Sequence, residues 1–227
     1  ELVEASLRLS YDLLSDELQA RWRTLTAFPA TFDRAAAAAV WAADETPAHD
    51  ALSELVRYSL LEWDGQAARY RLHDLARACA AAWLQEDESE QARRRHARHY
   101  EQVLRAADEL YLQGGDGVLQ GLALFDLERD NVEAGQAWAA ARAGDATLGA
   151  REEAARLCSA YPDAGAYVLN LRLHAQEWIR WLEAAAAAAA REIGDRRAVG
   201  AQTGNLGNAY SALGRVEEAI AHYEQAL

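Results

Sequence analysis

The chain has 227 residues and a formal net charge of −13, from 36 acidic and 23 basic residues. This charge argues against a nucleic-acid binder, because binding to a phosphate backbone needs a positive surface. No apolar run is long enough to cross a membrane and no signal peptide is recognisable, so we expect a cytoplasmic protein whose two cysteines, Cys79 and Cys158, are reduced.

Hydrophobic residues make up 51% of the chain, and only three prolines interrupt it. Many of these residues are alanine, the best helix former, so the composition favours a mainly α-helical fold. Residues 2–14 have apolar residues close to helical spacing. Ser15 is expected to cap a second helix and Asp33 a third, since both side chains can accept a hydrogen bond from a free amide of the first turn. A fourth helix is expected to begin at Thr46 and Pro47, with threonine as the cap and proline in the first helical position.

After the fourth helix the hydrophobic pattern changes to alternation around Asp64 and Gly65, a strong turn signal. We therefore predict a small β-hairpin over residues 61–72, followed by a helix from Asp74 to about Gln85. Three or four helices followed by a hairpin are typical of a winged-helix domain, which we place at residues 1–86.

The charged segment QEDESEQ is the predicted boundary to a helical connector over residues 87–145. The connector should contain a long helix over residues 90–112, ended by the glycines of QGGDG, and one or two further helices. Residues 146–227 are expected to form helical hairpins, with helix ends at Pro162 and Gly194. The predicted fold class is mainly α, with one small hairpin and the start of an α-solenoid.

The strongest pattern in the sequence is TGNLGNAYSALGRVEEAIAHYEQAL, at residues 203–227. It resembles a tetratricopeptide repeat, with small residues where two antiparallel helices approach and large ones in the seam between them. The matching positions are Leu206, Gly207, Tyr210, Gly214, Ala219, Tyr223 and Ala226. The resemblance implies packing roles for all of them, and an array whose surface binds an unknown protein or other ligand.

Residues 1–86 resemble the winged-helix part of bacterial signal-transduction ATPases with numerous domains. The resemblance rests on LRLSYDLLSDELQARWRTLTAFP, ALSELVRYSLLEW and RYRLHDLARACA. In this family a Met-His-Asp triplet ends the hairpin, and the triplet here is Leu72-His73-Asp74. The resemblance implies that His73 contacts the β-phosphate of ADP held by a preceding nucleotide domain, which keeps the protein in its off state. It also implies that Asp74 orders the turn and caps the following helix.

The phosphate-binding loop of such ATPases requires a lysine, and all 23 basic residues of this chain are arginine. We therefore expect no catalytic residue, no cofactor and no enzymatic activity in this chain. The resemblance implies ADP or ATP with Mg²⁺ in a longer parent protein, whose own nucleotide-binding domain is the expected partner of residues 1–86. The chain alone is expected to be a monomer, with oligomerisation on activation implied for the parent.

Two other functions fit the same pattern. One is the equivalent segment of a transcription regulator that carries a separate DNA-binding domain, and the other is a plain repeat scaffold for protein binding. Residues 1–86 hold 8 arginines and 14 acidic residues, so 8 − 14 = −6, and we expect this domain to contact protein rather than DNA.

The run RRRHARH, at residues 93–99, is interpreted as a helix surface that faces solvent or another domain. His96 and His99 within it have no convincing third ligand, so no metal site is predicted.

Overall fold

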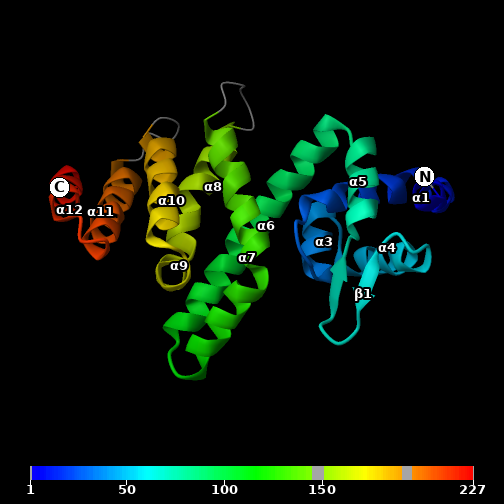
Figure 1. The fold of residues 1–227 in the computed structure, drawn as a ribbon, viewed down its shortest axis with the longest axis horizontal. Helices are drawn as coiled ribbons and strands as arrows, with labels where there is room; N and C mark the ends of the chain where they lie inside the picture. Colours follow the sequence, from blue (N-terminus) through cyan, green and yellow to red (C-terminus); the bar gives the residue numbers. More distant parts are fainter. Residues whose placement is uncertain (1, 145–150, 191–195, 227) are drawn as a thin grey trace. The chain divides into compact units, whose positions relative to one another are not determined.

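The computed structural model describes residues 2–144, 151–190 and 196–226, and the predicted helix end at Gly194 lies outside them. The described residues are mainly helical with one two-stranded hairpin, which confirms the predicted fold class (Figure 1). By their contacts the residues form two compact units, unit 1 (Glu1–His99) and unit 2 (Tyr100–Leu227). The three-part division with boundaries after residues 86 and 145 stays a prediction. None of the described helices is both long and apolar enough to cross a membrane.

Unit 1 contains five helices, a 3-10 turn and the hairpin before helix α6 begins. In chain order these elements are α1 (Leu2–Asp12), α2 (Asp16–Thr24), η1 (Leu25–Ala27), α3 (Arg34–Trp41), α4 (Glu45–Arg57), β1 (Glu62–Asp64), β2 (Arg69–Arg71) and α5 (Asp74–Trp83). They are followed by α6 (Glu86–Leu112). Helix α6 runs on past the division between the two units.

The helix starts in unit 1 follow capping chemistry. Ser15 and Asp33 cap α2 and α3, because each side-chain oxygen accepts a hydrogen bond from the amide three residues ahead, at 3.3 and 2.8 Å. The predicted start of α4 is wrong, since the helix begins at Glu45 rather than after Thr46. Pro47 therefore occupies the third helical position, where its missing N–H costs nothing because amides of the first turn have no partner within the helix.

The hairpin is present, but its turn is wider than Asp64 and Gly65 suggest. Asp64 still pairs with Arg69, so four residues, 65–68, make the connection. The Asp64 carboxylate shapes this loop by accepting hydrogen bonds from the amides two and three residues ahead, at 2.9 and 3.1 Å. The residue with left-handed backbone is Ala68, with φ of 53°, rather than the glycine.

A backbone bridge that the sequence did not reveal joins β2 to the segment before α3. Tyr70 and Phe32 exchange both of their backbone hydrogen bonds, at 3.0 and 2.7 Å. The ring of Phe32 stacks on Phe28 with centroids 4.1 Å apart, and both side chains are fully buried. The bridge is a single residue pair, so no alternating pattern marks it in the sequence.

Trp22 is the centre of the core of unit 1. Its side chain is fully buried, and its Nε1 donates a hydrogen bond to the Leu60 carbonyl at 3.0 Å. The rings of Tyr11 and Trp83 lie 5.4 and 6.0 Å from it, centroid to centroid. One indole thus holds α1, α2, α5 and the segment before β1 together.

The long helix begins at Glu86 rather than at residue 90, so Glu86, Asp87 and Glu88 lie in its first turn. Glu88 in its first turn accepts two hydrogen bonds from Arg23 of α2, at 3.0 and 2.6 Å, and one from the Gln85 amide at 3.3 Å. The bonds from Arg23 hold the pKa of Glu88 below its ordinary value. These acidic residues therefore start the helix, and Glu88 attaches it to α2.

Unit 2 is built from helices that pack on one another in succession (Figure 1). After the end of α6 come α7 (Asp116–Ala143), α8 (Arg151–Ala164), α9 (Ala166–Arg172), α10 (Ala175–Ala188), α11 (Arg196–Ala212) and α12 (Val216–Gln225). The predicted helix end at Pro162 is wrong, since α8 continues to Ala164. Gly165 then separates α8 from α9.

Gly165 and Asp108 explain why the short helix α9 forms there. A Cβ on Gly165 would lie 2.4 Å from Leu104 Cδ1, so only glycine lets the chain pass this close to α6. Asp108 on α6 then accepts hydrogen bonds from the Tyr167 and Val168 amides, both at 2.9 Å. Burial raises the pKa of Asp108, and these two amides oppose that rise. The cap comes from a residue far away in the sequence, so no local pattern announces it.

Substituting Trp22→Phe should lower the free energy of unfolding by about 1–3 kcal/mol, because the hydrogen bond to Leu60 and part of the buried ring are lost. Urea unfolding of the chain measures this change. Trp63→Phe is the matched control, since Trp63 is 46% exposed and should change the free energy by less than about 0.5 kcal/mol. Equal losses in the two variants would contradict the central role of Trp22.

Substituting Glu88→Gln should lower the free energy of unfolding at pH 7 by about 1–2 kcal/mol. Since the pKa of Glu88 is depressed in the folded state, this stabilisation is present above its unfolded pKa of about 4.3 and is lost as pH falls through the folded pKa. The difference between variant and unsubstituted chain should therefore vanish in acid. Glu54→Gln, which removes an exposed ion pair with Arg57, serves as the control. A difference that is independent of pH would contradict the assignment.

Candidate functional site

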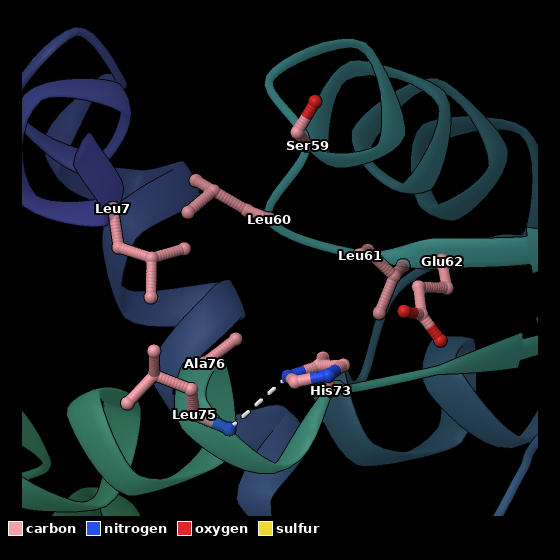
Figure 2. Close-up of a pocket in the computed structure, with 8 residues that line it drawn as sticks. All are labelled: Leu7, Ser59, Leu60, Leu61, Glu62, His73, Leu75 and Ala76. Atoms are coloured by element: carbon pink, nitrogen blue, oxygen red, sulfur yellow. Dashed lines mark hydrogen bonds between the residues drawn. The ribbon is translucent and has the colours of Figure 1, made fainter. Parts of the chain in front are cut away.

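His73 lies at the junction where β2 passes into α5. Its Nδ1 accepts a hydrogen bond from the Leu75 amide at 3.3 Å, so His73 is the N-cap of α5 (Figure 2). A neutral imidazole has one acceptor nitrogen and one donor nitrogen. Because Nδ1 is the acceptor here, the hydrogen belongs on Nε2. The cap thus orients the ring and leaves Nε2–H as a donor for another group.

Asp74 does not cap α5, which corrects the expectation from the sequence. It is the first residue of the helix, and the capping side chain comes from His73, the residue before it. Its side chain is 87% exposed and lies 4.0 Å from Arg71, atom to atom. A carboxylate in this position still interacts favourably with the positive end of the helix dipole.

His73 lines a small pocket of about 200 Å³ in unit 1. Figure 2 shows its walls, which come from α1, from the segment between α4 and β1 together with the first residue of β1, and from the junction of β2 with α5. The lining residues are Leu7, Ser59, Leu60, Leu61, Glu62, His73, Leu75 and Ala76. Pockets that hold a whole drug-sized ligand usually measure about 300–1,000 Å³. This one suits a single chemical group of a larger ligand, or one side chain of a partner.

The fold brings Leu7 and Glu62 to the histidine, and sequence reasoning missed both. Leu7 is 66 positions away from His73 by residue number, and Glu62 comes from the opposite strand of the hairpin. Only the hairpin register could have pointed to Glu62, because Glu62 pairs with Arg71, two residues before the histidine.

The turn between α11 and α12 has a backbone geometry that favours glycine. Gly214 has φ of 72°, a left-handed conformation that favours glycine. Its amide donates to the Ser211 carbonyl, and the Arg215 amide donates to the Tyr210 carbonyl, both at 3.0 Å. These two bonds form a Schellman motif, which ends α11 and reverses the chain.

The seam between α11 and α12 is filled by the predicted positions. Leu206, Tyr210 and Ala219 are buried, whereas Ala226 is half-buried at the end of α12. Tyr223 is partly exposed, and its hydroxyl donates to Asn208 at 2.8 Å. A Cβ on Gly207 would lie 2.5 Å from the Tyr223 ring. Position 207 therefore favours glycine, because a larger residue would displace the Tyr223 ring.

Tyr210 attaches this helix pair to the preceding helix. Its hydroxyl donates to Glu183 of α10 at 3.3 Å, and its ring stacks on His222 with centroids 5.0 Å apart. The Arg215 guanidinium lies 4.7 Å from the centre of the same ring. Helix α10 also has a buried face, which is formed by Trp178, Trp181 and Leu182. The helices before α11 are therefore packed around apolar side chains as well.

One face of α12 is apolar and exposed. Val216, Ile220 and Tyr223 recur at helical spacing, and they are 60%, 51% and 40% exposed. In the described ranges, no three His, Cys, Asp or Glu side chains are grouped so that they could hold a metal ion.

Comparisons with known proteins agree with this description of the C-terminal helices. Residues 204–227 match the tetratricopeptide repeat family. No curated protein matches the chain. Among solved structures, the chain is similar to a signal transduction ATPase with numerous domains that has a tetratricopeptide repeat sensor, from Pyrococcus horikoshii. That match has 14% identity and a TM-score of 0.34, and covers 96% of this chain and 44% of the other. The chain thus spans less than half the length of that protein.

Substituting Gly207→Ala should destabilise the α11–α12 pair by about 1–3 kcal/mol, because the Tyr223 ring has to move and its bond to Asn208 breaks. Gly204→Ala, on the same helix, is the matched control. Its Cβ would meet nothing closer than 4.0 Å, so the change should be neutral or slightly stabilising. Hydrogen exchange of the amides in the two helices measures both variants, and similar exchange in the two would contradict the packing account.

Proposed function

We propose that this chain is the regulatory and sensor-coupling segment of a signal-transduction ATPase with numerous domains. Unit 1 acts as the winged-helix part, which holds an attached nucleotide domain in its ADP-bound state through His73. The tetratricopeptide repeat acts in a sensor that binds a protein or another ligand. The observation that carries the proposal is the hydrogen bond from the Leu75 amide to His73 Nδ1, which makes Nε2 the donor nitrogen at the N-terminus of α5.

The junction has the chemistry that a phosphate oxygen requires. A helix N-terminus offers amide hydrogens and the positive end of the helix dipole. An N–H donor bonds more strongly to a charged phosphate than to a neutral acceptor. The pocket beside His73 has room for one group only, so the remainder of a nucleotide site would have to come from the attached domain. ADP supplies the charged phosphate, while this chain supplies a donor and its orientation.

The C-terminal repeat supports the sensor half of the proposal. Tetratricopeptide repeats stack into arrays whose surfaces bind proteins, and the apolar face of α12 is available for such stacking. A ligand that prefers one arrangement of the array shifts the population toward that arrangement. Release of the His73 contact would then favour exchange of ADP for ATP, and with it the oligomeric on state.

The protein that joins this chain to its nucleotide domain should release ADP faster when His73 is replaced by asparagine. Asparagine keeps a side-chain oxygen that can cap α5, so the fold is retained, but its amide nitrogen lies one atom closer to the backbone than Nε2 and does not reach the same position. Loss of a hydrogen bond to a charged group should accelerate release about tenfold or more. Stopped-flow measurement with a fluorescent ADP analogue gives the rate.

His49→Asn is the control for this experiment, because His49 is an exposed histidine on α4. It should leave ADP release unchanged. If His73→Asn releases ADP at the rate of the unsubstituted protein, His73 does not hold the nucleotide and the proposed function fails.

A further inference from the structure

Arg77, one turn into α5, is a half-buried arginine held by backbone carbonyls. Its Nη1 donates to the Phe28 carbonyl, and its Nη2 donates to the Leu72 carbonyl at 3.4 Å. No carboxylate of the described residues forms an ion pair with it, although Asp74 acts on it from further away. Burial lowers the pKa of Arg77, which reflects the cost of taking its charge out of water.

This arrangement is costly for an arginine that only fills space. Even partial burial of a charge without an ion-pair partner is unfavourable, and an apolar side chain of similar volume would avoid that cost. The five donors of a guanidinium in a fixed fork are well suited to tie two acceptors together. The role of Arg77 therefore follows from which two carbonyl groups its guanidinium joins, those of Phe28 and Leu72.

The Leu72 carbonyl belongs to the same planar peptide group as the His73 amide. Fixing that carbonyl fixes the direction from which the chain enters His73, and hence where its ring lies relative to the Leu75 amide. The other carbonyl belongs to Phe28, whose side chain is fully buried and stacks on Phe32. Phe32 in turn pairs with Tyr70 of β2, so Arg77 ties the junction to a fixed part of the core.

We propose that Arg77 is the positioning residue for His73. By joining the Leu72 and Phe28 carbonyls, it holds the junction so that Nδ1 meets the Leu75 amide and Nε2–H remains available as a donor. The importance of that orientation for nucleotide binding rests on the proposed function above, whereas the orientation itself is a property of this chain. Arg77 acts through His73 and does not have to touch a ligand.

Arg71 provides a matched control. It carries the same charge and lies two residues before His73, but its side chain is 54% exposed and its ion-pair partner is Asp74, at 4.0 Å. Arg71→Gln and Arg77→Gln remove the same charge near the same histidine. Only the second substitution releases the Leu72 carbonyl.

The test uses ¹⁵N spectra of the His73 ring and hydrogen exchange of the Leu75 amide in the full chain, without nucleotide. The unsubstituted chain and Arg71→Gln should show a single tautomer with hydrogen on Nε2. Arg77→Gln should shift the ring toward mixed tautomers and accelerate exchange at Leu75 about fivefold or more. Arg77→Lys retains the charge and can still reach one carbonyl, so it should recover part of the signal and provides a second variant if glutamine prevents folding.

A merely structural role would lower the unfolding temperature of Arg77→Gln and leave the ring spectrum and the Leu75 exchange of the folded protein unchanged. That result would overturn the inference, as would equal changes in Arg71→Gln. Failure of the proposed function is a separate outcome. In that case the ring spectrum responds to Arg77→Gln as expected, but His73→Asn leaves ADP release from the larger protein unchanged.

Discussion

The hydrogen bond from the Leu75 amide to Nδ1 of His73 determines the chemistry of the junction between β2 and α5. It fixes the tautomer, and thereby decides that the outward nitrogen is a donor rather than an acceptor. It also satisfies one of the amides that a helix start leaves free. One contact thus caps α5 and orients the His73 ring. Arg77 and the bridge between Phe32 and Tyr70 matter because they keep the backbone where this bond can form.

Sequence reasoning succeeded where the deciding chemistry is local. Ser15 and Asp33 bond amides three residues away, so their capping roles follow from residue type and position. The hairpin follows from alternation around Asp64, although its turn is longer than predicted because the aspartate shapes a wider loop. The repeat at the C-terminus follows from small residues at fixed spacing, and Gly207 and Gly214 have a steric or conformational reason to be glycine.

The same reasoning failed where partners are distant in the sequence. The acidic start of α6 was predicted to lie before the long helix, because nothing local shows that Arg23 pairs with Glu88. Helix α9 depends on Asp108, some sixty residues away from the amides it binds. The resemblance implied that Asp74 caps α5, but the N-cap residue is His73, whose side chain accepts the bond from the Leu75 amide. The pocket around His73 is assembled from three separate parts of the chain, so its lining could not be predicted from the motif.

The central claim is that His73 acts through Nε2 while Nδ1 remains bound to the helix. The most direct test is the ¹⁵N spectrum of the His73 ring in the protein that includes the nucleotide domain, recorded with ADP and with ATP. The account predicts that ADP shifts the Nε2 signal and leaves Nδ1 as a hydrogen-bond acceptor, and that the Nε2 shift is lost with ATP. A ring spectrum that is the same with ADP, with ATP and without nucleotide would contradict it.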